Sequence, residues 1–101
     1  MEVVINSSNY EEEVLKSTKP VILEFHASWW GACSMLEPSI KELAKEHEDI
    51  KFAIVDVDDN MDLANEYRVS SIPALFAIKD GKVVNSLVGA ESKEKILSLL
   101  D

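Results

Sequence analysis

The sequence contains one cysteine, three glycines and three prolines among 101 residues. A single cysteine excludes an intramolecular disulfide, and two histidines far apart in sequence add little from which to build a metal centre. Basic residues are also scarce, because ten Lys and Arg stand against nineteen Asp and Glu, for a formal net charge of -9. This balance argues against nucleic acid and against an anionic membrane surface as partners.

Long apolar runs are absent as well. No run approaches the ~20 residues that a membrane-spanning helix needs, and the first residues lack the basic start and apolar stretch of a secretory signal. The remaining composition, 47% hydrophobic and 29% charged, is ordinary for a globular chain of this length. We therefore expect one domain over residues 1–101, a cytoplasmic location, a monomer, and no cofactor or metal.

Strand and helix patterns alternate along the chain. The expected elements are a strand at Val3–Ile5, a helix whose capping box is Ser8 and Glu11, a buried strand at Val21–Ala27, a helix at Ala32–His47 with Pro38 inside it, a strand at Lys51–Val57, a helix at Met61–Tyr67, a hairpin of Ala74–Ile78 and Val83–Val88 about Asp80-Gly81, and a last helix capped by Ser92. This order predicts an α/β three-layer sandwich, in which helices flank a mixed central sheet.

The segment Ser28–Ser34, with the sequence S-W-W-G-A-C-S, joins the buried strand to the following helix. Cys33 falls in the first turn of that helix, where unpaired amide hydrogens and the helix dipole stabilise a thiolate, the reactive form of cysteine. The alternative is that Cys33 is a small buried hydrophobe.

The residues Val21–Pro38, V-I-L-E-F-H-A-S-W-W-G-A-C-S-M-L-E-P, resemble the active-site region of thioredoxin. The resemblance extends over essentially the whole chain and includes Ser71–Ala74 and Val88–Ala90. It implies the thioredoxin fold and the lineage of cytosolic protein-disulfide reductases, which serve electron transport and cell redox homeostasis. By the same resemblance, disulfide-containing proteins would be the substrates and a thioredoxin reductase would be a partner.

The redox-active centre departs from the family at one decisive position. Where the family has Trp-Cys-Gly-Pro-Cys, this chain has Trp29-Trp30-Gly31-Ala32-Cys33, so Trp30 stands in place of the nucleophilic cysteine. Cys33 matches the resolving cysteine, which has no mixed disulfide to resolve when the first thiol is missing. We therefore expect impaired or no dithiol reduction. Trp30 has three candidate origins: a natural change, a designed one, or a UGA codon that specifies selenocysteine and is read as tryptophan.

Two further residues near this segment are candidates for proton chemistry. By the resemblance, Glu24 takes the place of a buried aspartate that moves the proton of the resolving cysteine. Burial should raise its pKa, and the lysine that the family has on the next strand falls at Ile54. His26 either pairs with Cys33 as an activating base or fills an aromatic position.

The Ile72-Pro73 pair resembles the cis-proline loop that faces the active site in the family and binds extended substrate segments through its backbone. We expect an apolar patch around Cys33 made by Trp29, Trp30, Ile72, Val88, Gly89 and Ala90. Gly31, Ala32 and Pro73 complete the predicted substrate-binding residues. An alternative function follows, a redox-inactive module that binds an extended peptide or a partner protein on this patch.

Overall fold

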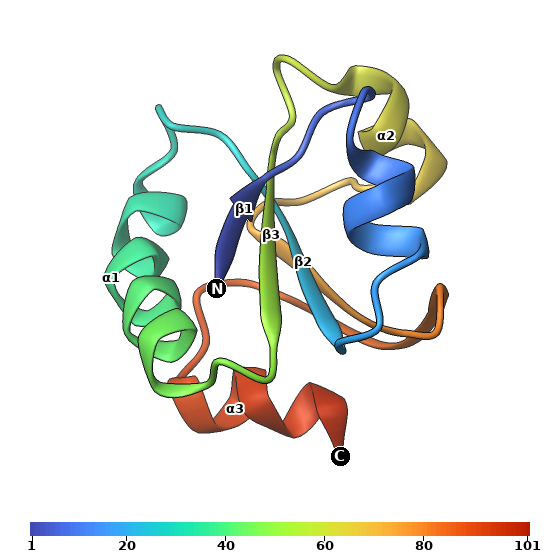
Figure 1. Cartoon of the computed structure of the whole chain (residues 1–101). Coiled ribbons are helices and arrows are strands. Elements are labelled where there is room, and N and C mark those ends of the chain that lie inside the picture. The colour runs from blue at the N-terminus through green and yellow to red at the C-terminus, as the bar shows by residue number, and fades with distance from the viewer.

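A computed structural model describes all 101 residues as one five-stranded sheet with helices on both of its faces (Figure 1). The strands are β1 (Glu2–Val4), β2 (Val21–His26), β3 (Lys51–Asp56), β4 (Ala74–Lys79) and β5 (Lys82–Val88). The helical segments are η1 (Glu11–Leu15), α1 (Gly31–Glu46), α2 (Met61–Glu66), α3 (Lys93–Leu97) and η2 (Ser98–Leu100). The predicted α/β sandwich with a mixed sheet is confirmed.

The strands lie in the order β1-β3-β2-β4-β5. β1 and β2 pair parallel to β3, whereas β4 pairs antiparallel to β2 and to β5. Parallel neighbours need crossover connections, and α1 provides the one between β2 and β3. Because β2 is the central strand, the turn that follows it lies at the middle of the sheet, where the strands end.

Each face of the sheet carries its own hydrophobic core. Ile22 of β2 packs with Leu36, Ile40 and Leu43 of α1 and with Ile96 near the C-terminus. On the opposite face, Leu23 and Phe25 of the same strand pack with Val14 and Leu63, beneath η1 and α2. Because side chains alternate along a strand, Glu24 and His26 share the α1 face with Ile22. A carboxyl group is thereby placed between the sheet and α1.

The predicted turn and cap near the C-terminus are present. Asp80 and Gly81 both have positive φ, at 53° and 77°, and they connect β4 to β5 as expected of a tight hairpin. A side chain at position 81 would meet the carbonyl oxygen of Leu15 at 2.9 Å. Ser92 caps α3 by accepting a hydrogen bond from the Lys95 amide at 3.2 Å.

The predicted capping box of the first helix is wrong. Ser8 and Glu11 make no reciprocal bonds, because the Asn6 carboxamide oxygen accepts hydrogen bonds from the Ser8 amide and hydroxyl groups, at 2.9 and 2.6 Å. The segment η1 then closes as a wide π-type turn, in which the Lys16 amide donates to the Glu11 carbonyl at 2.9 Å.

Candidate functional site

The turn between β2 and α1 holds both tryptophans. Trp30 has an extended backbone, with φ -94° and ψ 124°, and caps α1, which begins one residue earlier than expected, at Gly31. The amides of Cys33 and Ser34 donate to the Trp30 carbonyl at 3.1 and 3.2 Å. Ala32 is half-buried in the first turn, and a side chain at Gly31 would enter open space. The residue in the family's nucleophile position is therefore a helix cap at the surface.

Both indole groups are exposed but held by hydrogen bonds. Trp30, 46% exposed, donates from its indole Nε1 to the Ile72 carbonyl oxygen at 3.1 Å. Trp29, 68% exposed, donates to the Asp58 carboxylate at 2.7 Å. Their rings meet edge to face with centroids 6.0 Å apart. Trp30 thus lies across the backbone that directly precedes Pro73, and the Ile72-Pro73 peptide bond is cis.

An apolar groove with a volume of about 440 Å³ borders these rings. Its lining residues are Trp29, Trp30, Val57, Ala64, Val69, Ser70, Ser71 and Ile72. Three members of the expected patch are in this set, namely Trp29, Trp30 and Ile72. The sequence did not indicate the part of the groove next to α2, where Ala64 of α2 and Val69 after this helix line it together with Ile72.

The other members of the expected patch do not line this groove. Gly89 lies beside the loop, where its amide donates to the Pro73 carbonyl at 2.8 Å, and Val88 pairs with Ala74 in the sheet. Val88 and Ala90 are exposed. β5 ends at Val88, opposite Ala74, so these residues follow the sheet rather than the tryptophans, and their part in a substrate-binding patch stays a prediction.

Cys33 is buried, with 3% of its surface exposed, and it belongs to a different cavity from the groove. Burial raises the pKa of the thiol, and the nearby Glu24 carboxyl acts in the same direction, while a hydrogen bond with the Ala27 backbone acts in the opposite one. The direction of this shift is opposite to the thiolate stabilisation expected at the helix start, and the burial of Cys33 agrees with the alternative of a small buried hydrophobe.

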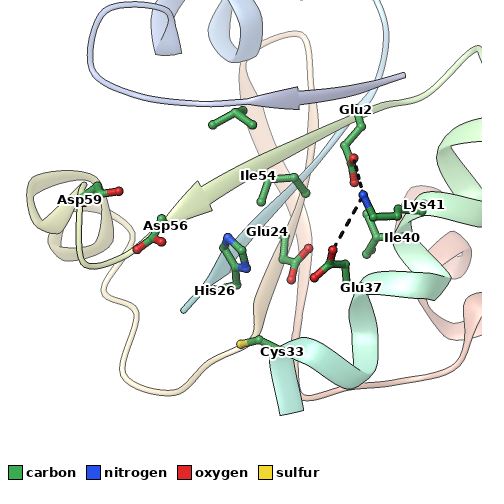
Figure 2. A pocket seen from close by; sticks show the side chains of 11 residues that line it. Glu2, Glu24, His26, Cys33, Glu37, Ile40, Lys41, Ile54, Asp56 and Asp59 are labelled. Atoms are coloured by element: carbon green, nitrogen blue, oxygen red, sulfur yellow. Dashed lines mark ion pairs between the residues drawn. The ribbon is translucent and has the colours of Figure 1, made fainter. Parts of the chain in front are cut away.

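The cavity that Cys33 borders has a volume of about 310 Å³ and lies between α1 and the sheet (Figure 2). It is lined by Glu2, Val4, Glu24, His26, Cys33, Glu37, Ile40, Lys41, Ile54, Asp56 and Asp59. We call it the acidic cavity, because five carboxyl groups line it against one lysine. Lys41 Nζ lies 3.7 Å from the Glu2 carboxylate and 3.8 Å from that of Glu37, so this lysine forms ion pairs with those two carboxylates and with no other group of the cavity.

Glu24 lies at the wall of the acidic cavity with 4% of its surface exposed. Burial, and to a smaller extent the negative charges of Glu2 and Glu37, raises its pKa from 4.5 to about 7. The parallel register places Ile54 directly opposite Glu24 on β3, the position at which the resemblance implies a lysine in the family. The direction of the shift is the predicted one; burial is its main cause, and the neighbouring strand supplies no cation to oppose it.

His26 lines the same cavity, at the end of β2, but no hydrogen bond joins it to Cys33. In Figure 2 the Cys33 sulfur and the Glu24 carboxyl group point in different directions from their elements. The pairing of His26 with Cys33 as an activated nucleophile is therefore not formed in this structure.

Sequence reasoning missed the outer residues of the acidic cavity. Glu37 follows Cys33 by one helical turn, so helix periodicity could have placed both on one face of α1. Glu2 reaches the cavity only because β1 pairs with β3, which no local signal reports. No set of three or more His, Cys, Asp or Glu side chains converges as a metal ion requires, and no helix is long and apolar enough to cross a membrane.

Comparison with known proteins agrees with this architecture. The family model described as Thioredoxin matches residues 1–101. The mitochondrial thioredoxin of Mus musculus is 39% identical over 98 residues, covering 96% of this chain and 59% of the mouse protein. Thioredoxin 1 of Synechococcus elongatus is 37% identical, covering 96% of this chain and 92% of that protein. Thioredoxin of Chlorobaculum thiosulfatiphilum is 43% identical, with coverage of 92% and 87%.

This chain spans less than two thirds of the length of the mammalian mitochondrial relatives, but most of the length of the bacterial ones. The match of the family model to the whole sequence, together with the strand order and the Trp29–Cys33 turn, leads to one conclusion. The chain belongs to the thioredoxin family.

Proposed function

We propose that this chain is a thioredoxin-family protein whose dithiol reductase chemistry is blocked at Trp30 and whose protein-binding edge is retained. Reduction of a disulfide to two thiols needs two electrons, which a dithiol supplies by forming its own S–S bond. A protein with one thiol can advance only to a mixed disulfide and stops there. The observation that carries the proposal is that the sole thiol, Cys33, is buried while Trp30 occupies the surface position at the helix start.

The reductase lineage remains the framework for this proposal. A protein with a thiol or selenol at position 30 would present that group at the exposed cap of α1, beside the Ile72 backbone. Its substrates would be disulfide-containing proteins, and a thioredoxin reductase would reduce it again after each turnover. Under the selenocysteine hypothesis Trp30 is a reading of UGA, which a TGG codon in the gene would eliminate.

The second candidate function, a redox-inactive binding module, is favoured by the apolar groove. The groove borders the Ile72 carbonyl, an acceptor that an extended peptide could use in the manner of an added strand. At present the Trp30 indole donates to that carbonyl at 3.1 Å. A peptide would therefore have to displace the indole or bind beside it.

The experiment that tests the proposal is the reduction of a protein disulfide by the parent chain, Trp30→Cys and Trp30→Ser at equal concentration. Trp30→Ser matches the size change without a nucleophile, so it separates sulfur chemistry from removal of the indole. We expect turnover only from Trp30→Cys, at least ~10³-fold above the parent, the scale on which loss of a covalent nucleophile is felt.

Turnover by the parent chain would overturn the proposal, since Cys33 would then act as the nucleophile. If none of the three proteins turns over while all are folded by circular dichroism, the scaffold itself is not a reductase. The binding-module function would then be the one to pursue.

A further inference from the structure

The Glu24 carboxyl group lacks a partner within the protein. It takes part in no ion pair, and none of the side-chain hydrogen bonds of the structure includes it. At the same time, no side-chain nitrogen or oxygen that is sealed from solvent is left without a partner. The Glu24 oxygens therefore open into the acidic cavity, although the residue as a whole is only 4% exposed.

The charges that face Glu24 are mostly of the same sign. They come from β1 (Glu2), from α1 (Glu37 and Lys41), from β3 (Asp56), from the turn after β3 (Asp59), and from His26 on its own strand. Lys41 is engaged by Glu2 and Glu37, and the Asp56 carboxylate accepts a hydrogen bond from the Asp58 amide at 2.8 Å. Ile54, opposite Glu24, is apolar. The cavity thus lacks a cation at its innermost carboxyl group.

The space available suits an organic cation better than a metal ion. A volume of about 310 Å³ holds many water molecules and lies at the lower end of the range found for small-molecule sites. The carboxyl groups do not converge in the manner that a metal ion needs. In Figure 2 the carboxyl groups of Glu24 and Glu37 come from facing elements, β2 and α1, and lie side by side at the cavity. A planar guanidinium presents several N–H donors in a fixed fork, so one such group can donate to two neighbouring carboxylates.

We propose that the acidic cavity binds a guanidinium group, which supplies in trans the cation that Ile54 does not provide, with Glu24 as its buried carboxylate. The group can belong to a small free guanidine or to an arginine side chain of a partner protein. Binding replaces water around Glu24 with charge-assisted hydrogen bonds and requires no electron transfer. Trp30 takes no part in this binding, because it lines the other hollow.

The test is a titration of the full chain, followed by the ¹³C resonance of the Glu24 carboxyl group, at constant ionic strength and at pH 8. The probes are methylguanidinium, N-acetyl-arginine methylamide, N-acetyl-lysine methylamide and sodium chloride. We expect a saturable change at Glu24 with the two guanidinium probes, and a depressed Glu24 pKa when the site is filled. Tighter binding of the arginine derivative identifies a protein side chain as the source, whereas equal binding identifies the small free guanidine.

Two variants separate the site from general attraction to an acidic protein. Glu24→Gln should weaken binding by about 30-fold or more, as expected when one member of a buried charge pair is removed. Glu94→Gln makes the same change of charge at an exposed position outside the cavity and should bind like the parent. In these variants, binding is read from the amide resonances of the cavity residues.

The proposal is overturned if the Glu24 resonance changes linearly and equally with sodium chloride and guanidinium. Saturable binding that survives in Glu24→Gln would also overturn it, since the carboxyl group would then not be the anchor. Equal affinity for the lysine derivative would contradict the assignment to guanidinium. None of these results bears on disulfide reduction, so failure here is distinguishable from failure of the proposed function.

Discussion

Two hollows border the start of α1, and they treat their polar groups differently. In the apolar groove, both indole N–H groups have acceptors, at 2.7 and 3.1 Å. In the acidic cavity, the buried Glu24 carboxyl group has no partner and its pKa is raised to about 7. Trp30 belongs to the first hollow and Cys33 to the second. A hydrogen-bonded aromatic group therefore lies at the surface, whereas the single thiol lies beside a carboxyl group that has no partner.

The largest effect should come from removing the Glu24 charge. A carboxyl group whose pKa is raised in the folded state destabilises the fold once it ionises, so the parent should lose stability as the pH rises from 4.5 through 7. Relative to the parent, Glu24→Gln should therefore gain up to about 3 kcal/mol of unfolding free energy between pH 4.5 and pH 8. Urea denaturation at several pH values measures this difference, with Glu94→Gln as the control. A difference independent of pH would show that Glu24 is not the group responsible.

A cation placed opposite Glu24 should remove most of the shift. In Ile54→Lys, the register puts the new side chain directly opposite Glu24, and an opposite charge close to a carboxyl group lowers its pKa by about 2. The Glu24 ¹³C titration gives the pKa directly. The same variant should lose guanidinium binding, because its lysine would pair with the Glu24 carboxylate in place of the guanidinium group. An unchanged pKa would mean that the lysine side chain turns out to solvent.

The groove should respond less than the cavity. Trp30→Phe keeps an aromatic ring but removes the donor to the Ile72 carbonyl, which should cost about 1 kcal/mol or less of unfolding free energy. Slow hydrogen exchange at the Trp30 indole in the parent would report the same bond. Trp29→Phe is the matched control, because its bond to Asp58 is also exposed. Indole exchange as fast as that of a free side chain would show that Trp30 does not hold the loop.

The smallest effect should be on the reactivity of Cys33, and it sharpens the assignment of the thiol to the cavity. Because burial raises the thiol pKa and Glu24 adds to the effect, alkylation by iodoacetamide should still accelerate with pH above the ordinary cysteine range. Glu24→Gln should increase the rate at pH 8 by less than about tenfold. Trp30→Phe should leave it unchanged. The reverse pattern would place the thiol on the groove side.

Much of the fold could be predicted from sequence because its signals are local. The apolar run of Val21–Ala27, the helical spacing after Ala32 and the Asp80-Gly81 turn each indicate an element without reference to the rest of the chain. The first cap was predicted wrongly because the Asn6 carboxamide oxygen accepts from the Ser8 amide, the bond that a capping box assigns to Glu11, and also from the Ser8 hydroxyl group. The local sequence allows the Ser8 amide to donate to either Asn6 or Glu11, and only the structure shows which bond forms.

Some features of the candidate site follow from sequence, and others depend on the tertiary structure. Sequence determined that position 30 has no sulfur, that one thiol remains at Cys33, that a carboxyl group interrupts the central strand, and that its neighbour Ile54 is not a cation. Only the tertiary structure decided that the Cys33 thiol is buried with a raised pKa, that the Trp30 indole lies on the Ile72 carbonyl, and that Glu2 and Glu37 join Glu24 around one cavity. The reason is physical: residue identity fixes which groups can react, but desolvation and charge at a site depend on elements that approach from distant parts of the chain.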